Sequence, residues 1–211
     1  MYYIVKRGID IIGAVILAII FSPIALLTAI AISLETPGPV LADTPMRVGK
    51  NGKLFKLYKF RSMIINAHQL LRKDPKFHDL YHQYKKNSYK LHEDPRVTKV
   101  GKFIRKHSLD EVPQLLNVIK GDMSLVGPRP YYPDELADQQ KKYPHTKNLV
   151  QVVLSAKPGM TGEWQVSGRS EVNFDKRIEI DARYVKQQSI QHDIAILFKS
   201  PIVMITGKGA V

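Results

Sequence analysis

The longest apolar stretch of the chain, residues 11–34, contains no charged side chain. At about 1.5 Å of rise per residue, a straight helix of this length would cross a lipid bilayer. Pro23 interrupts it, because proline has no N–H to donate to the carbonyl of Ile19 and disfavours helical angles at Ser22. The pattern therefore predicts two helices of about 17 Å each, which enter one leaflet and return.

Positive charge lies on both sides of this stretch. Lys6 and Arg7 precede it, and six cations follow it: Arg47, Lys50, Lys53, Lys56, Lys59 and Arg61. Positive flanks mark the cytoplasmic side of a membrane segment, so two positive flanks favour a re-entrant hairpin. A single kinked transmembrane helix stays open as an alternative. A secretory signal peptide cleaved near residues 29–31 is a further alternative, although the apolar stretch is long for one.

The remaining pattern predicts a compact domain of mixed structure. Residues 40–48 and 54–60 flank Asn51-Gly52, a pair typical of tight hairpin turns. Residues 64–71 and 98–106 have helical spacing. Residues 108–120 read as another helix, which Gly121 ends.

The C-terminal part continues with helices. Asn173 is expected to cap one of them. Residues 190–206 are apolar and interrupted by Pro201, which favours a helix lying flat on the bilayer. We predict a mainly helical α+β fold. Residues 1–36 would be a re-entrant helix-break-helix anchor, and residues 37–211 a compact helical catalytic domain with a small β-hairpin and interfacial helices.

Composition narrows the class of partner. The 211 residues include 32 Lys and Arg against 19 Asp and Glu, a net charge of +13. Such a balance indicates an anionic partner, namely lipid headgroups, phosphorylated substrates or nucleic acid. The chain has no cysteine, which excludes disulfides and thiolate chemistry.

Candidate chemistry concentrates in residues 105–130. Ser108 and Glu111 have the spacing of a capping box, which would start a helix at this point. The free N–H groups of a helix start also bind phosphate, and Arg105 and Arg129 could bring cations to it. Asp110 and Glu111 are sequence neighbours whose side chains would project about 100° apart on a helix. Two roles are therefore expected, one carboxylate attacking phosphorus and the other holding a metal or activating the acceptor.

A second candidate site is weaker. His78 and His82 have the spacing of two zinc ligands on one helix face, but Asp79 stands where a zinc enzyme has Glu. The sequence offers no clear third ligand. An exposed amphipathic face is the preferred interpretation.

Taken together, these segments resemble the bacterial sugar transferases, the monotopic phosphoglycosyl transferases that dip into the membrane. The matching segments are Ser22-Pro23, KFRSM at 59–63, LDEVPQ at 109–114, GDMSLVGPRP at 121–130 and KPGMTGEWQVSGR at 157–169. They follow the family's order from the N-terminus almost to the last predicted helix.

The resemblance implies roles for individual residues. Asp110 matches the nucleophile that forms a covalent phosphosugar intermediate, and Glu111 matches its partner at Mg²⁺ or the acceptor. Anion-binding positions are matched by Lys59, Arg105 and Arg129, and a nearby acid is matched by Asp181. The nucleotide would be bordered by the loop that contains Gly159, Thr161, Gln165 and Arg169, in which Trp164 could equally be a core or interface anchor.

The implied reaction transfers a sugar 1-phosphate from a UDP-sugar to polyprenyl (undecaprenyl) phosphate with Mg²⁺ and releases UMP. It would be the first membrane step of exopolysaccharide, capsule, O-antigen or glycoprotein glycan assembly, on the cytoplasmic face of the bacterial inner membrane. Further partners are anionic lipids, downstream glycosyltransferases and, as one option, a second copy of the chain. The length of residues 68–95 is similar to that in enzymes that transfer galactose or glucose 1-phosphate.

Three other functions stay open. A lipid-phosphate phosphatase would release inorganic phosphate instead of UMP. A basic membrane scaffold would explain the hairpin and the charge but not Asp110 and Glu111 beside arginines. A nucleic-acid-binding protein would explain the charge, yet the cations are dispersed and no aromatic–basic motif stands out. We therefore expect no nucleic-acid partner.

Overall fold

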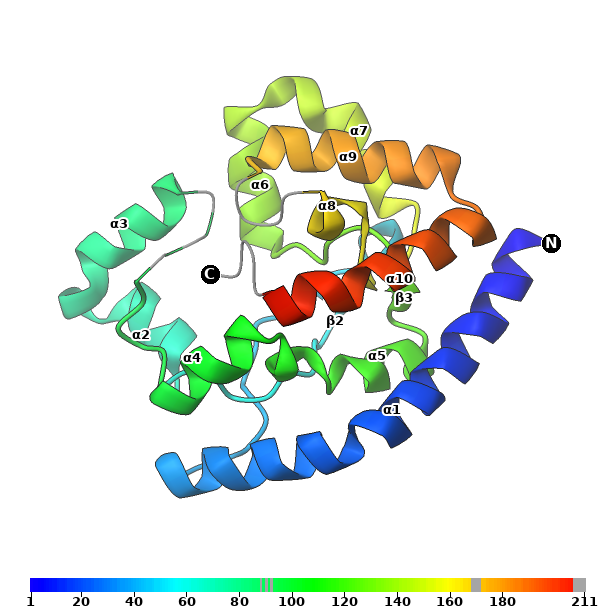
Figure 1. Ribbon diagram of the computed structural model, residues 1–211. Helices are drawn as coiled ribbons and strands as arrows, with labels where there is room; N and C mark the ends of the chain where they lie inside the picture. The colour runs from blue at the N-terminus through cyan, green and yellow to red at the C-terminus, as the bar shows by residue number, and fades with distance from the viewer. Residues whose placement is uncertain (88, 90, 92, 168–171, 207–211) are drawn as a thin grey trace.

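The computed structural model describes residues 1–87, 89, 91, 93–167 and 172–206, and helices dominate it (Figure 1). The helices are α1 (Tyr2–Glu35), α2 (Ala67–Lys73), α3 (His78–Lys86), α4 (Lys99–Lys106), α5 (Gln114–Lys120), α6 (Pro133–Lys142), α7 (Lys147–Leu154), α8 (Glu163–Val166), α9 (Phe174–Gln187) and α10 (Ile190–Thr206). The strands are β1 (Arg47–Val48), β2 (Leu54–Phe55), β3 (Ser124–Val126) and β4 (Gly159–Thr161). The predicted mainly helical α+β class is confirmed.

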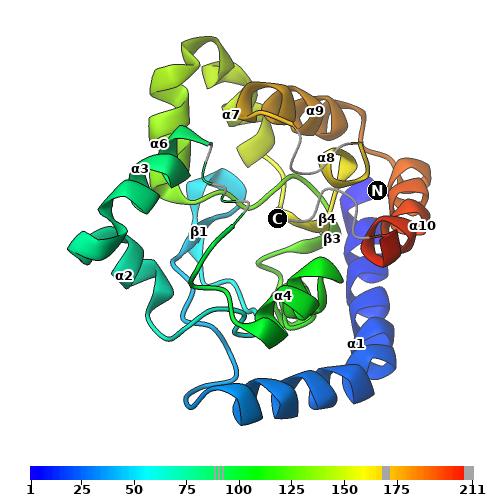
Figure 2. The same ribbon diagram turned by 60° about the vertical axis from the view of Figure 1, so that its left-hand side comes forward.

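The apolar N-terminal segment is one helix, not two. α1 continues through Pro23 and bends sharply partway along its length, as Figure 2 shows. The hydroxyl of Ser22 donates to the carbonyl of Ile19 at 2.8 Å, which is the carbonyl that Pro23 cannot serve. A substitute donor lets the helix kink without ending. The prediction of a break at Ser22 is therefore wrong, although the change of direction is present.

The outer face of α1 is apolar and exposed. The helix is long and apolar enough to cross a membrane, with a mean hydropathy of 2.8 in its most apolar window. Ile19 is 68% exposed and Leu34 is 82% exposed. Only a narrow inner face is buried, and it includes Ala14 beside α5 and Ile32 beside α4. Exposed aliphatic area of this extent indicates a partner that is itself apolar.

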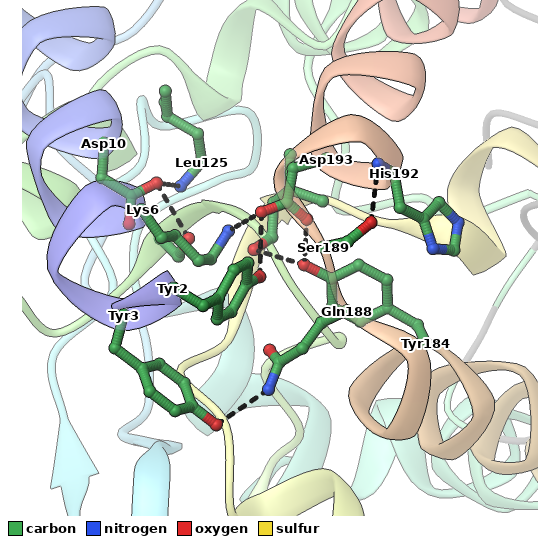
Figure 3. A network of polar contacts seen from close by, with 12 residues as sticks. Tyr2, Tyr3, Lys6, Asp10, Leu125, Tyr184, Gln188, Ser189, His192 and Asp193 are labelled. Carbon is green, nitrogen blue, oxygen red and sulfur yellow. Dashed lines mark hydrogen bonds and ion pairs between the residues drawn. The ribbon is translucent and has the colours of Figure 1, made fainter.

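Buried polar contacts attach the first turns of α1 to the rest of the chain (Figure 3). Asp10 accepts from the hydroxyl of Ser124 and from the backbone N–H of Leu125, both at 2.9 Å. Asp193 on α10 accepts from Lys6 at 2.6 Å, and it also accepts from the hydroxyls of Tyr2 and Tyr184. Buried charges are tolerated only when they are paired in this way, so the network fixes the position of α1.

The predicted hairpin is present but short. β1 pairs antiparallel with β2, and Asn51 and Gly52 between them adopt positive φ angles of 56° and 79°. Pairing resumes at a single bridge between Leu41 and Phe60. The expected strands over residues 40–48 and 54–60 are therefore mostly extended chain.

A second sheet was not expected from the sequence. β3 and β4 pair in parallel, with Ser124 opposite Gly159 and Val126 opposite Thr161. Two three-residue strands are too short to show an alternating pattern. Glycine permits the close approach, since a Cβ at Gly159 would overlap the backbone nitrogen of Gly127 and the carbonyl oxygen of Thr161.

Two apolar clusters support these elements. The first joins α1, α5, β3 and α10 and includes Leu115, Val118 and Ile196. The second lies between α6, α7 and α9 and includes Leu136, Val153 and Ile178. The N-terminal anchor thus shares a core with the catalytic part of the predicted architecture.

We expect Gly159→Ala to destabilise the protein by about 1–3 kcal/mol, because the added methyl meets backbone atoms that cannot rotate away. Gly8→Ala is the control, since a Cβ there meets nothing within 4 Å and α1 gains helix propensity. Thermal unfolding in detergent should show a lower midpoint for the first variant only. Equal midpoints for wild type and Gly159→Ala would contradict the close approach.

Candidate active site

A cavity of about 350 Å³ brings together six of the residues that the sequence singled out. Its walls come from the extended segment before α2, from α4 and the following turn, from the loop before α6, and from α8. The predicted residues that line it are Lys59, Arg105, Asp110, Glu111, Arg129 and Gln165.

The turn that carries the two carboxylates differs from the predicted helix start. Leu109–Glu111 is a single 3-10 turn, and α5 begins only at Gln114. Ser108 has a φ of 56° and its side chain makes no capping bond, so the predicted capping box is wrong. Pro113 explains the interruption, because it lacks the N–H that would continue a helix from Leu109. A long helix dipole therefore does not begin at Asp110.

Asn117 holds the neighbouring extended segment in place. Its side chain is fully buried, accepts from the backbone N–H of Tyr58 at 2.9 Å and donates to the carbonyl of Lys56 at 2.8 Å. A side-chain amide used in this way substitutes for a strand partner. The segment after β2 is thereby fixed against α5.

Lys59 lies between backbone that Asn117 binds on one side and Phe60 on the other. The N–H of Phe60 donates to the carbonyl of Asp110 at 2.9 Å. The Lys59 Nζ lies 3.3 Å from Asp110 Oδ2 and 2.7 Å from Glu111 Oε1. The two carboxylates therefore converge on one cation, whereas a regular helix would have turned them apart.

Burial sets the electrostatics of this triad. Burial raises the pKa of Asp110, and the adjacent Glu111 raises it further against the opposing charge of Lys59. Burial alone would lower the pKa of Lys59, but the two carboxylates outweigh it and raise that pKa. Lys59 therefore stays charged, and its charge favours an ionised Asp110.

Asp181 on α9 holds the backbone of Arg129 from the side away from the cavity. The backbone N–H of Arg129 donates to Asp181 Oδ2 at 3.1 Å, and its guanidinium lies 5.2 Å from the centre of the Trp164 ring. Asp181 is fully buried outside the cavity lining, and burial raises its pKa to about 7. Asp181 thus supports the loop that carries Arg129, and Trp164 is a buried platform for that side chain.

Arg177, a buried arginine near Trp164, was not predicted from the sequence. Arg177 has no exposed area, and it donates to Glu135 at 3.4 Å. Its guanidinium lies 5.3 Å from the ring centre of Tyr131 and 5.6 Å from that of Trp164. Its spacing of four residues before Asp181 on α9 is the one feature that could have pointed to it.

Other cations that line the cavity serve the fold. Arg61 donates to the carbonyls of Thr36 and Pro37, both at 2.8 Å, where the chain leaves α1. Arg47 stacks on Tyr132, with its guanidinium carbon 3.3 Å from the ring centre. Arg47 was expected only as flanking charge, and its stacking was not predicted.

The nucleotide-loop candidates are divided among different places. Gln165 lines the cavity and donates to the carbonyl of Met160 at 3.0 Å. Gly159 and Thr161 lie in β4, where the Thr161 hydroxyl is 2.7 Å from that of Ser200 on α10. Arg169 lies outside the described residues.

Magnesium can be tested against the side chains present. Mg²⁺ in proteins is bound by one or two carboxylates together with substrate phosphates and water. Asp110 and Glu111 approach one common point, now taken by the Lys59 amine, so their donor set fits such an ion. In the described part of the chain, no group of three or more metal-ligating side chains is found. His78 and His82 lie together on exposed α3 with ring nitrogens 3.2 Å apart, which leaves a zinc site without support.

The raised pKa of Asp181 predicts a pH-dependent stability. The Asp181 carboxyl keeps its proton up to about pH 7 in the folded protein, whereas it loses that proton near pH 4 in the unfolded chain. The free energy of unfolding should therefore decrease as the pH rises from about 4 to about 7. The Asp181→Asn side chain cannot titrate. Between pH 5 and 8 the free energy of unfolding of this variant should therefore decrease by about 2–3 kcal/mol less than that of wild type.

Thermal unfolding midpoints at both pH values measure this difference, expected at about 5–10 °C. Asp79→Asn is the control, because Asp79 is fully exposed. Parallel pH profiles for wild type and Asp181→Asn would show that Asp181 is ionised in the folded protein.

Comparison with known proteins places this arrangement in a family. Residues 1–207 match the family described as bacterial sugar transferase. The chain is 45% identical to the undecaprenyl-phosphate galactose phosphotransferase of Salmonella typhimurium, over 97% of this chain and 41% of that protein. It is 38% identical to the exopolysaccharide production protein ExoY of Sinorhizobium fredii, over 97% of this chain and 87% of that protein.

A third relative is the UDP-glucose:undecaprenyl-phosphate glucose-1-phosphate transferase of Escherichia coli, at 35% identity over 98% of this chain and 41% of that protein. The chain therefore spans about two fifths of the length of several relatives and most of the length of ExoY. With a match that runs through almost every residue, the chain belongs to the bacterial sugar transferase family.

Proposed function

We propose that the protein transfers a sugar 1-phosphate from a UDP-sugar to polyprenyl phosphate and releases UMP. The observation that carries the proposal is a buried aspartate beside a second carboxylate, Asp110 and Glu111, in a cavity lined by Lys59, Arg105 and Arg129. Both substrates are anionic phosphates, which such a cavity attracts. The names of two relatives contain undecaprenyl-phosphate as well as a hexose, which supports this substrate pair.

In the first step, an oxygen of Asp110 attacks the β-phosphorus of the UDP-sugar. The new bond joins this oxygen to phosphorus, and the bond from the β-phosphorus to the bridging oxygen breaks, so UMP leaves with the electron pair. Lys59 and Arg129 would hold the diphosphate oxygens, and a bidentate Arg contact is among the stronger ones. Charge-assisted donors of this kind each contribute about 3–4 kcal/mol to transition-state stabilisation.

In the second step, a phosphate oxygen of the lipid acceptor attacks the same phosphorus and displaces the Asp110 carboxylate. The product is a polyprenyl diphosphate sugar, and the enzyme returns to its starting state without net proton transfer. Dividing the transfer in two avoids holding two anionic substrates together. Glu111 lies beside the reacting carboxylate, where it can prepare the acceptor phosphate.

Mg²⁺ is part of the proposal, with Asp110 and Glu111 as its protein ligands. When bound, the ion would neutralise charge that develops on the phosphate oxygens. Lys59 already occupies the point that both carboxylates share, so it must be able to move towards a substrate phosphate when the site fills.

The anchor supports a monotopic arrangement on the cytoplasmic face. Asp10 attaches the first half of α1 to β3, and Glu35 at its end accepts from the N–H of Val100 on α4 at 3.1 Å. Both ends of the helix therefore contact one body, which a straight membrane span would not allow. Exposed Phe198 on α10 and Phe103 on α4 would extend the apolar surface that meets the bilayer.

The product of this reaction is the lipid-linked first sugar of a surface glycan. One relative is named an exopolysaccharide production protein, ExoY, and another a galactosyl transferase, CpsE. We therefore propose a place at the start of exopolysaccharide, capsule or related glycan assembly, with downstream glycosyltransferases that extend the lipid-linked sugar.

The topology is testable because the chain lacks cysteine. Single cysteines at Tyr3 and at Lys53 should react with an impermeant maleimide only after the cells are made permeable. Both residues are expected on the cytoplasmic side. A periplasmic marker protein with one cysteine reports that the reagent reached that space. Labelling of Tyr3→Cys in intact cells would exclude the re-entrant arrangement.

The nucleophile is tested by trapping the intermediate. Wild type incubated with a radioactive UDP-sugar and no acceptor should become labelled and release one equivalent of UMP. Asp110→Asn should show neither, because its amide cannot attack phosphorus. Glu111→Gln should turn over more slowly and still retain some label, and exposed Asp79→Asn should behave as wild type.

Kinetics give an independent measurement of the same step. Initial rates at varied donor and acceptor should give parallel lines in double-reciprocal plots, as a two-step transfer requires. Intersecting lines together with an unlabelled wild type would remove Asp110 as nucleophile.

A further inference from the structure

The cavity has a second wall whose chemistry differs from that of the carboxylate and cation wall. It is built by α2, α3 and Tyr89, and α2 and α3 lie to one side of the other helices (Figure 2). His68 on α2, Tyr84 on α3 and Tyr89 line the cavity from this side. The proposed transfer chemistry uses none of them.

This wall is fastened at its base. Two nitrogens of Arg96 donate to the Asp94 carboxylate, at 2.8 and 2.6 Å. A third nitrogen donates to the carbonyl of Ala67 at 2.8 Å. Arg96 is only 2% exposed. With its donors directed at the fold, Arg96 is a structural brace at the start of α2.

The far part of the wall is tied to α6. Asp138 accepts from Tyr89 at 2.7 Å and pairs with Lys85 at 2.9 Å. Arg72 pairs with Asp134 on the same helix at 2.6 Å. These contacts join both α2 and α3 to α6, so the wall is oriented by the neighbouring helix, and binding groups that are held in place can discriminate between similar ligands.

Asp94 and Arg96 also line the cavity and offset each other's charge in an ion pair, and the other polar side chains of the wall are neutral. Burial lowers the pKa of His68 to about 4, with help from the charges of Arg47 and Arg96. His68 is therefore uncharged at neutral pH and offers one donor and one acceptor. Burial also raises the pKa of Tyr84, whose hydroxyl stays protonated. Neutral donors and acceptors beside aromatic rings suit a polyol better than a phosphate.

The neutral wall begins beside the proposed diphosphate site. His68, Tyr84 and Arg129 line the same cavity, and so does Tyr132, three residues after Arg129. The His68 ring meets the Tyr132 ring edge to face at 6.0 Å. The group bound here is therefore one attached directly to the diphosphate.

Two parts of a UDP-sugar satisfy that condition, the uridine and the sugar. A uracil ring needs an open aromatic face, and Arg47 already covers one face of Tyr132 at 3.3 Å. A hexose instead needs several hydroxyl partners, which His68 and Tyr84 can supply. We propose that His68 and Tyr84 read the hydroxyl pattern of the donor hexose and thereby set sugar specificity, an inference that rests on the proposed transferase function.

The test compares UMP release from UDP-glucose, UDP-galactose and their N-acetylated counterparts, with undecaprenyl phosphate as acceptor. Tyr84→Phe removes one hydroxyl and keeps the ring, so it should remain folded, and His68→Ala removes the imidazole. For the preferred donor, kcat/KM should fall by about 10- to 100-fold in each variant. The ratio between donors should change by about tenfold, whereas inhibition by UMP should stay within about twofold of wild type.

Tyr81→Phe is the matched control, since Tyr81 lies on the same helix and does not line the cavity. Thermal unfolding identifies a variant that has lost its fold, and Tyr84→Phe then decides alone. Weaker UMP inhibition with unchanged donor ratios would assign the wall to uridine and overturn the inference. So would a Tyr84→Phe variant that matches Tyr81→Phe in every donor.

Failure of the underlying function is a separate result. If the wild type releases no UMP from any UDP-hexose in the presence of acceptor, the transferase proposal is refuted and the inference falls with it. If the wild type releases UMP but the His68 and Tyr84 variants keep the wild-type ratios between donors, the transferase function is supported. The proposed role of the wall in sugar specificity is then wrong.

Discussion

The site depends on the attachment of one extended segment to the turn that carries the carboxylates. Asn117 holds the backbone of residues 56–58, and the N–H of Phe60 donates to the carbonyl of Asp110. Lys59 lies between these fixed points, and its amine contacts both Asp110 and Glu111. The buried Asp110 and the partly exposed Glu111 would repel each other and a phosphate, and the held lysine offsets that repulsion. Removing the contacts that Asn117 and Phe60 make would therefore disturb the charge balance of the site as well as its shape.

Much of the fold follows from local sequence signals. Gly121 ends α5 with a φ of 91°, as the sequence predicted, and the Asn51-Gly52 turn is present. Two local predictions failed. Ser108 has the capping pattern but adopts a left-handed angle, and the helix that it should start is interrupted before Gln114. Pro23 bends its helix without ending it, because the neighbouring Ser22 hydroxyl donates to the carbonyl of Ile19, a local contact that the proline rule alone does not include.

The sequence predicted the lining residues of the candidate site but few of the residues that support them. The lining residues Lys59, Arg105, Asp110, Glu111 and Arg129 were nominated from motifs, and they do line one cavity; their roles stay predictions. The supporting layer was largely invisible, because a buried Arg177 or a stacked Arg47 looks like any surface cation in sequence. Burial of an arginine is decided by aromatic rings that come from distant segments, here Tyr131, Tyr132 and Trp164.

The membrane anchor and the site are joined through the same short segment. Arg61 holds the carbonyls where the chain leaves α1, and Lys59, two residues earlier, reaches the carboxylates. Two extended residues span at most about 7 Å, so the end of the anchor and the cavity cannot separate by much. In the proposed reaction the acceptor's phosphate lies at the bilayer surface, where its lipid tail holds it. An anchor bent at Pro23 and fastened at both ends would keep Asp110 at that level, so the transfer needs no large domain movement.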